Sequence, residues 1–120
     1  MVRLTFRHIT GSRATEIDEI QLGAHRELIL GRGPSAAVRF DVREDTTVAR
    51  HHARISWTEG DPIAFEITDL KSRRGTYVNG RLITTTIRLA VGDVIRLGAN
   101  GPEVEVRWQR PTEASLQLIG

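Results

Sequence analysis

Two short polar segments of the chain combine cationic side chains with small and hydroxyl residues. The first reads Val48-Ala49-Arg50-His51-His52-Ala53, and the second reads Asp69-Leu70-Lys71-Ser72-Arg73-Arg74-Gly75-Thr76-Tyr77-Val78-Asn79-Gly80. Guanidinium groups carry planar sets of N–H donors that match carboxylate and phosphate oxygens. The segments between them, Ala53–Trp57 and Ala64–Thr68, alternate in a way typical of strands. A fold that returns both polar segments to one edge would form a positive surface suited to a phosphorylated partner.

Other chemistries have weaker support in the sequence. His51 and His52 are adjacent, and neighbouring strand residues point to opposite faces, so they do not easily share a metal ion. His8 and His25 add no ligand spacing, and the chain has no cysteine for a thiolate site or a disulfide. No nucleophile has an evident base, and no glycine-rich nucleotide loop leads into a helix. We therefore expect a protein that is not an enzyme and that has no metal or cofactor.

The composition favours one small domain. The chain has 120 residues, of which 39% are hydrophobic, and 17 basic against 15 acidic residues give a net charge of +2. Lys71 is the single lysine, so arginine supplies nearly all of the positive charge. No apolar run approaches the ~20 residues of a membrane-spanning helix, and the N-terminus alternates from the start, unlike a signal peptide. Together with the lack of cysteine, this leads us to expect a cytoplasmic protein or the cytoplasmic domain of a larger one.

Short alternating segments separated by turn residues run along most of the chain. Gly31-Arg32-Gly33-Pro34 breaks one apolar run, and Asn79-Gly80 is a strong hairpin signal because both residues tolerate positive φ. Gly92-Asp93 marks a further turn. The strands expected outside the two segments above are Val2–His8, Ala14–Ile20, Arg26–Leu30, Ala36–Phe40, Thr76–Val78, Arg81–Ile87 and Glu103–Gln109. The segment Leu89–Gly98 is expected to contain the turn at Gly92-Asp93.

This pattern predicts an all-β sandwich, because many short strands with frequent turns are typical of that class. We expect the sandwich to occupy residues 1–110. The remaining residues, 111–120, are expected to form a short helix, a disordered tail or the start of a linker.

Four motifs, in this order, resemble those of the forkhead-associated (FHA) domain family. They are Gly31-Arg32 after a strand, Val48-Ala49-Arg50-His51-His52-Ala53, the Asp69–Gly80 segment, and Leu89-x-x-Gly92-Asp93-x-Ile95-x-Leu97-Gly98. Each motif is weak alone, but the ordered set is specific and spans about Leu28 to Val106. The resemblance implies two mainly antiparallel sheets with a phosphothreonine-peptide site made by loops at one end.

The resemblance also implies roles for individual residues. Arg32 and Arg50 match positions that contact the phosphopeptide, and Ser72 lies in the matching binding motif. Gly31 matches the glycine that turns the strand into the first recognition loop, and His52 matches a histidine that supports the loops. The remaining structural matches are Gly75, Thr76, Asn79 and Gly80, with Asn79 bracing a turn.

Three positions depart from the family pattern at the expected binding surface. Ala49 stands where the family has a phosphate-contacting serine, Arg73 where it has threonine or serine, and Arg74 where an asparagine contacts the peptide backbone. Two interpretations follow. Either the two arginines replace the missing hydroxyl donors, or the site has decayed.

These observations leave three hypotheses about function. The first is a phosphothreonine-dependent protein-binding module, which implies an upstream Ser/Thr kinase. The second is a degenerate domain of the same fold that mediates phospho-independent interaction or oligomerisation. The third and weakest is nucleic-acid binding, because the net charge is small and the aromatic residues mostly fall on core faces rather than forming a stacking surface.

Overall fold

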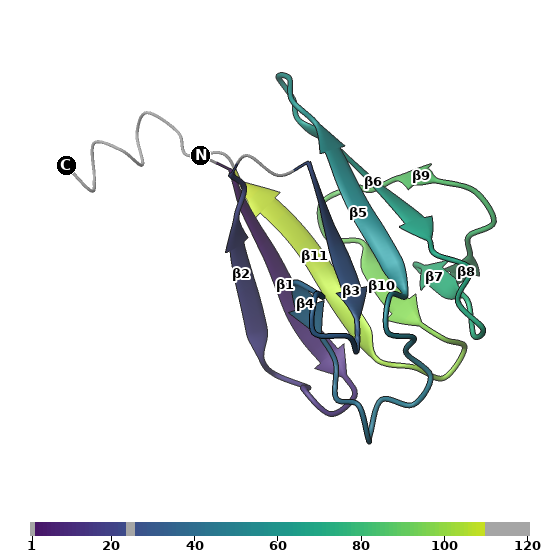
Figure 1. Ribbon diagram of the computed structural model, residues 1–120. Helices are drawn as coiled ribbons and strands as arrows, with labels where there is room; N and C mark the ends of the chain where they lie inside the picture. Colours follow the sequence, from purple (N-terminus) through teal and green to yellow (C-terminus); the bar gives the residue numbers. More distant parts are fainter. Residues whose placement is uncertain (1, 24–25, 110–120) are drawn as a thin grey trace.

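The computed structural model describes residues 2–23 and 26–109, which form two packed β-sheets and contain no helix (Figure 1). The first sheet contains, in spatial order, β2 (Ile17–Gln21), β1 (Arg3–Thr10), β11 (Glu103–Gln109), β10 (Val94–Leu97), β7 (Thr76–Val78) and β8 (Arg81–Leu82). The second contains, in spatial order, β4 (Val38–Arg39), β3 (Glu27–Gly31), β5 (Ala53–Thr58), β6 (Ala64–Asp69) and β9 (Ile87–Arg88). The two-sheet sandwich confirms the predicted fold class.

Nearly all strand pairs are antiparallel. Among the described strands, β3 and β4 form the parallel pair, in which Leu30 lies opposite Val38. The connection between them, residues 32–37, contains a turn in which the N–H of Ala36 donates to the carbonyl of Gly33. The strand β4 that follows has only two residues. The expected strand Ala36–Phe40 is therefore shorter than predicted.

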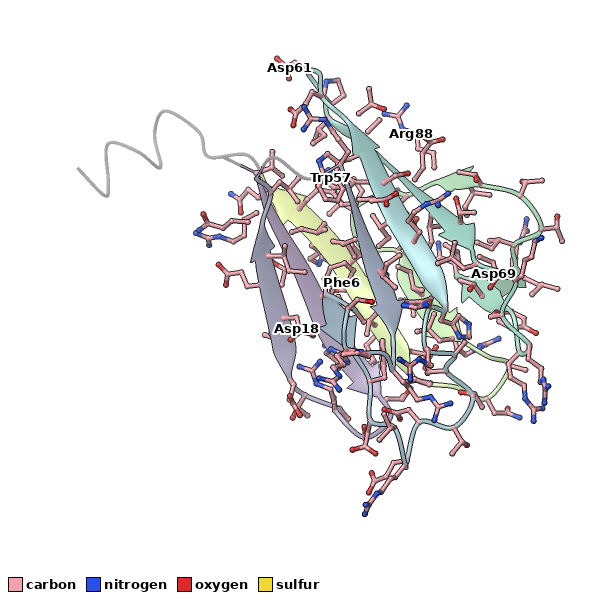
Figure 2. All side chains as sticks on the ribbon, in the orientation of Figure 1. Phe6, Asp18, Trp57, Asp61, Asp69 and Arg88 are labelled. Atoms are coloured by element: carbon pink, nitrogen blue, oxygen red, sulfur yellow. The ribbon has the colours of Figure 1, made fainter. Side chains whose placement is uncertain are left out.

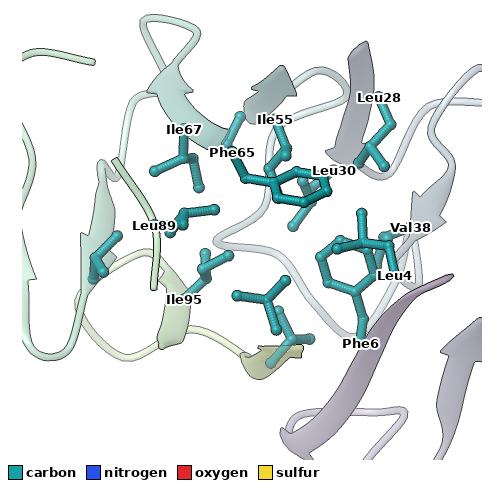
Figure 3. Close-up of a cluster of buried hydrophobic side chains, with 14 of the residues drawn as sticks. Leu4, Phe6, Leu28, Leu30, Val38, Ile55, Phe65, Ile67, Leu89 and Ile95 are labelled. Atoms are coloured by element: carbon teal, nitrogen blue, oxygen red, sulfur yellow. The ribbon is translucent and has the colours of Figure 1, made fainter. Parts of the chain in front are cut away.

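Alternation along the strands places one face of each sheet in a shared core. Leu4 and Phe6 of β1, Ile55 of β5 and Phe65 of β6 are fully buried, as the period of two predicts. Figure 3 shows these side chains meeting between the sheets. Burial of apolar surface at about 25 cal/mol per Å² makes this core the main source of stability.

Aromatic side chains gather inside the sandwich rather than on its surface. The ring of Phe65 lies 4.6 Å from that of Trp108 and 5.8 Å from that of Trp57, measured between centroids. The exposed edge of Tyr77 is partly covered, because the guanidinium of Arg96 stacks 4.6 Å from its ring centroid. No row of exposed rings exists within the described part of the chain.

The turns explain where strands end. The expected strand Ala14–Ile20 begins only at Ile17, because Gly11 and Thr15 have positive φ and residues 11–16 form hydrogen-bonded turns.

Asn79 and Gly80 have φ values of 51° and 83°, which confirms the predicted hairpin between β7 and β8. The expected strand Arg81–Ile87 is instead divided into β8 and β9, which join different sheets. The region predicted as a tail, 111–120, lies outside the described residues.

Candidate functional site

Three polar loops adjoin the second sheet at the same end of its strands. Leu30 of β3 pairs with Ala53 of β5, which in turn pairs with Asp69 of β6. The end of β3, the start of β5 and the end of β6 are therefore side by side, as the lower part of Figure 1 shows. The antiparallel register brings together residues 31–37, 41–52 and 69–75, which we call the recognition loops.

Backbone hydrogen bonds join the recognition loops to each other. The N–H of Arg32 donates to the carbonyl of Ala49 at 3.0 Å, and the N–H of Leu70 donates to the carbonyl of His52 at 3.0 Å. Gly31 makes this approach possible, because a Cβ there would lie 2.0 Å from the carbonyl oxygen of Arg50. The close approach of the Arg50 backbone to β3 at Gly31 therefore requires the absence of a side chain.

His52 connects two recognition loops through both ring nitrogens. Its Nδ1 accepts a hydrogen bond from the N–H of Ala49 at 3.0 Å, and its Nε2 lies 2.8 Å from the carbonyl oxygen of Gly75. These partners select the neutral tautomer that carries the proton on Nε2. Burial lowers the pKa of His52 below its usual value, with the hydrogen bond to Gly75 and the charge of Asp69 opposing the shift. The side chain is thus a neutral support for the loops.

Asp69 organises the turn that follows β6. Its carboxylate accepts hydrogen bonds from the backbone N–H and the hydroxyl of Ser72, and from the hydroxyl of Thr76 at 2.7 Å. The Ser72 oxygen also accepts the N–H of Gly75 at 3.0 Å. Ser72, predicted as a binding residue, therefore uses its hydroxyl within the loop. Thr76, predicted as structural, is fully buried.

Arg32 is half-buried, and its guanidinium lies against loop 41–52. The Nη1 group donates to the carbonyl of Val42 at 2.6 Å, and Nε donates to the carbonyl of Val48. A guanidinium has five N–H donors, so three remain for a ligand. These carbonyl contacts fix the orientation of the charge before any ligand binds.

Five further cations of the recognition loops are exposed. None of them forms an ion pair with a described acidic residue: Arg43, Arg50, Lys71, Arg73 and Arg74. Some arginines on the strands differ, because Arg3, Arg7, Arg54 and Arg107 are each paired with a glutamate. In Figure 2, side chains with blue nitrogen tips extend from the lower loops into solvent. The recognition loops thus present a group of cations that have no ion-pair partner among the described residues.

Ala49 lies in loop 41–52 and offers no polar side chain. It is half-buried, its N–H is bonded to His52, and its carbonyl is bonded to Arg32. Both backbone groups are therefore already used, and the methyl group offers no donor. Any phosphate held here would depend on the arginines and on free donors of neighbouring loops.

Asn79 and Gly80 lie in the hairpin after β7 and support the fold rather than the cationic surface. The amide of Asn79 donates to Asp93 at 2.9 Å, and its oxygen accepts the N–H of Val94 at 3.0 Å. Asp93 also accepts the N–H of Ala90 at 2.8 Å, as expected for a turn residue. These contacts tie the β7–β8 hairpin to the start of β10.

Two residues near the site were missed by sequence reasoning. Asp45 is buried and accepts hydrogen bonds from the hydroxyl and N–H of Ser12 and from the N–H of Asp41, so it anchors loop 41–52 to the β1–β2 turn. Leu82 is 53% exposed, and its Cδ1 covers Gly75. An apolar residue two positions after the Asn-Gly pair was the available signal for Leu82, whereas no local motif marks Asp45.

The described residues show no alternative metal or membrane feature. Residues 2–23 and 26–109 contain no group of three or more histidine, aspartate or glutamate side chains placed to hold a metal. His51 is exposed and bonds Ser35 at 3.0 Å, while His52 is buried, so the two rings lie apart. Over the same residues, no helix has the length and apolarity needed to cross a membrane.

A two-sheet sandwich with glycine-arginine, histidine and Ser-x-x-Gly-Thr loops gathered at one edge defines a known class of interaction domain. The family model for the FHA domain matches residues 28–98, more than half of the chain, and the chain belongs to this family. This confirms the resemblance inferred from the four motifs.

Similar proteins agree with this assignment. The oxoglutarate dehydrogenase inhibitor of Corynebacterium efficiens is 34% identical over 101 residues, covering 71% of this chain and 68% of the relative. An FHA domain solved in a study of phosphothreonine-dependent FHA domain interactions is 34% identical, with a TM-score of 0.69 and coverage of 92% and 99% of the two chains. The FhaA FHA domain in complex with the intracellular domain of Rv3910 is also 34% identical, with a TM-score of 0.67 and coverage of 87% and 99%.

Proposed function

We propose that this chain is a non-enzymatic binding module that recognises a phosphothreonine-containing protein through its recognition loops. The observation that carries the proposal is the set of cations without ion-pair partners, Arg32, Arg50, Arg73 and Arg74, at the edge where the loops meet. A phosphothreonine carries a charge of about −1.5 to −2 and three acceptor oxygens. Charge-assisted hydrogen bonds from guanidinium groups are among the stronger ones in proteins.

Hydrogen bonds from buried and half-buried side chains hold the recognition loops in a fixed arrangement. His52 joins residues 49 and 75, and Asp69 holds Ser72 and Thr76, so the cations project from a framework that is already ordered. A ligand that binds a pre-organised surface loses less affinity to ordering of the protein. We assign Arg32 the central phosphate contact because its side chain is already oriented by two carbonyl groups.

The departures at Ala49, Arg73 and Arg74 change how the phosphate would be held. The missing hydroxyl at Ala49 removes one donor, and we infer that Arg73 and Arg74 supply replacement donors from the neighbouring loop. The relatives support a regulatory context, since one is named for inhibition of oxoglutarate dehydrogenase and another is complexed with an intracellular domain of a second protein. An upstream Ser/Thr kinase is part of this proposal, because the ligand must first be phosphorylated.

Two other functions are tested by the same measurement. Phospho-independent interaction is favoured by Ala49, which lacks the hydroxyl of the family pattern. Nucleic-acid binding has less support, because the rings of Trp57, Phe65 and Trp108 pack together in the sandwich rather than forming a surface for bases.

The experiment is a screen of the domain against an oriented phosphothreonine peptide library, followed by calorimetry with the best peptide and its unphosphorylated form. We expect tighter binding of the phosphorylated form, and loss of that preference in Arg32→Ala. Arg88→Ala is the matched control, because Arg88 is exposed, forms no ion pair with a described residue and lies on β9 away from the loops (Figure 2). Equal binding of both peptide forms would move the domain to the phospho-independent class. Binding of random DNA that the phosphopeptide does not compete away would favour nucleic acid.

A further inference from the structure

The positive charge of the recognition loops is unevenly distributed. Lys71, Arg73 and Arg74 lie within four residues that contain no acidic side chain. Loop 41–52 differs, because it carries Asp41, Glu44 and Asp45 along with its arginines. The excess positive charge therefore belongs to residues 71–74, which we call the basic segment.

No described intramolecular interaction neutralises the basic segment. The nearest acid in the sequence, Asp69, is fully engaged by Ser72 and Thr76. Asp45 is engaged by Ser12 and by the backbone of Asp41. Since the described acids around the loops are committed to local hydrogen bonds or lie on the other loop, the basic segment is available to an external anion.

The basic segment and Arg32 reach the surface from different loops. The Cβ of Arg74 lies only 3.2 Å from where a Cβ on Gly98 would be, and Thr47 contacts the same glycine. The base of Arg74 therefore borders the turn between β10 and β11. Arg32, by contrast, is bonded to the carbonyls of Val42 and Val48. The cations therefore arise from separate loops.

A charge comparison indicates what else the ligand carries. One phosphothreonine supplies about −1.5 to −2 charges, which two or three cations balance. The recognition loops present six cations against the exposed acids Asp41 and Glu44, so a ligand with one phosphate and neutral flanks would leave positive charge unmatched. The cations are Arg32, Arg43, Arg50, Lys71, Arg73 and Arg74. Complementary charge across an interface governs both specificity and association rate.

We propose, resting on the proposed phosphothreonine binding, that the partner is an acidic phosphothreonine segment whose aspartate or glutamate side chains flank the phosphothreonine and contact the basic segment. The carboxylates would pair with Arg73, Arg74 and Lys71, while Arg32 holds the phosphate. Exposed ion pairs are individually modest, so two or three of them give an acidic peptide about a five- to twentyfold advantage at low salt. The advantage decreases with added salt, because exposed charges are screened over about 10 Å at 0.1 M.

The test uses four peptides of one length. The first has phosphothreonine with neutral flanks, the second has acids on the N-terminal side and the third has acids on the C-terminal side. The fourth is acidic on both sides but carries unmodified threonine. Calorimetry compares the wild-type chain with Lys71→Gln/Arg73→Gln/Arg74→Gln, and with Arg54→Gln/Arg81→Gln/Arg88→Gln as a control that removes the same charge elsewhere. Thermal unfolding verifies that each variant is folded, and the single substitution Arg74→Gln replaces the triple variant if that one fails.

We expect at least one acidic phosphopeptide to bind the wild-type chain five- to twentyfold more tightly than the neutral phosphopeptide, by about the amount estimated for two or three exposed ion pairs. The gain should fall below about twofold in the basic-segment variant and persist in the control variant. Equal binding of neutral and acidic phosphopeptides would overturn this inference while leaving the proposed function in place. If the unphosphorylated acidic peptide binds as tightly as the acidic phosphopeptides, both the inference and the proposed function are overturned, because the loops would then act only as a general site for negative charge.

Discussion

The Nε2 atom of His52 lies 2.8 Å from the carbonyl oxygen of Gly75, although the two residues are 23 positions apart in the chain. The same ring accepts the N–H of Ala49 through Nδ1. One buried side chain therefore sets the separation of two recognition loops. Because the cations occupy those loops, the geometry of the surface depends on a residue that need not touch the ligand.

Replacement of His52 by alanine should destabilise the domain. The N–H of Ala49 and the carbonyl of Gly75 would each lose a buried partner, and an unsatisfied buried polar group costs about 1–3 kcal/mol. Chemical denaturation should show this loss in the free energy of unfolding. Arg73→Ala is the control, because an exposed side chain without an ion pair usually changes stability by less than about 0.5 kcal/mol. Equal unfolding curves for wild type and His52→Ala would show that the ring does not support the loops.

The pH dependence of stability should carry the signature of the same histidine. Burial lowers the pKa of His52 in the native state, whereas in the unfolded chain the imidazole returns to about 6.5. Between these two pKa values only the unfolded state binds the proton, so acid favours unfolding. The contribution is complete above about pH 6.5 and is lost as the pH falls through the lowered native pKa.

Urea denaturation of wild type and His52→Ala from about pH 8 to about pH 5 measures this contribution directly. The difference between their unfolding free energies should decrease toward acid, because the alanine variant lacks the titrating group. Protonation would place a donor on Nδ1 facing the N–H of Ala49, which removes that hydrogen bond. A difference that stays constant across the range would contradict the assignment.

The Gly31 position should tolerate no side chain. A Cβ there would meet the carbonyl oxygen of Arg50 at 2.0 Å, and backbone atoms cannot easily move away. Overpacking of this kind typically costs about 1–3 kcal/mol, so Gly31→Ala should lower the melting temperature. Gly23→Ala is the matched control, because no atom lies within 4 Å of its added Cβ. Similar melting temperatures for the two variants would mean that the backbone around Gly31 and Arg50 can move apart more easily than their contact indicates.

Strands with one buried face were predictable because their residues alternate between apolar and polar, as their side chains alternate between the core and solvent. The alternation of Leu4 and Phe6, or of Phe65 and Ile67, follows directly from the pleat and from burial. The two-residue strands β4, β8 and β9 carry no such pattern, since their assignment depends on hydrogen bonds to distant partners. The parallel pairing of β4 with β3 was therefore not accessible from local sequence.

The motifs located the recognition loops but not the contacts inside them. Residue types at Gly31, His52 and Gly75 resemble the family, and the structure places all three at one edge. The bonds from Arg32 to the carbonyls of Val42 and Val48 depend on how loop 41–52 folds, which no motif specifies. Asp45 was missed for the same reason, because its partner Ser12 is 33 residues away.

Asn79 offers a separate test of the hairpin between β7 and β8. Its φ is 51°, and its side chain bonds both Asp93 and the N–H of Val94. Asn79→Ala should lose these bonds and also adopt an unfavourable left-handed conformation, for a total of about 2–3 kcal/mol. Asn79→Gly should lose only the bonds, since glycine accepts positive φ. Thermal unfolding compares the two, and a glycine variant no more stable than the alanine variant would show that backbone conformation is unimportant there.

Ala49→Ser tests whether the departures from the family pattern compensate for one another. If Arg73 and Arg74 hold the phosphate, the wild-type chain binds a phosphothreonine peptide and the added hydroxyl contributes one further hydrogen bond to a charged group. Such a bond adds at most about 1.5–3 kcal/mol to the binding free energy, which corresponds to a gain in affinity of about ten- to a hundredfold. The neighbouring arginines make this an upper limit, because they already occupy phosphate oxygens.

The family-like variant Arg73→Thr/Arg74→Asn distinguishes two interpretations. In the first, called compensation, the two arginines replace the hydroxyl that Ala49 lacks, and in the second the site has lost phosphothreonine binding. Calorimetry with one phosphorylated and unphosphorylated peptide pair compares it with wild type, Ala49→Ser and Arg32→Ala. Under compensation the double variant binds more weakly than wild type, because two guanidinium groups that can each form charge-assisted bonds are lost. Tighter binding by the double variant would mean that the arginines obstruct the phosphate position. Absence of any phosphate preference in wild type, not restored by Ala49→Ser, would instead identify a site that no longer recognises phosphothreonine.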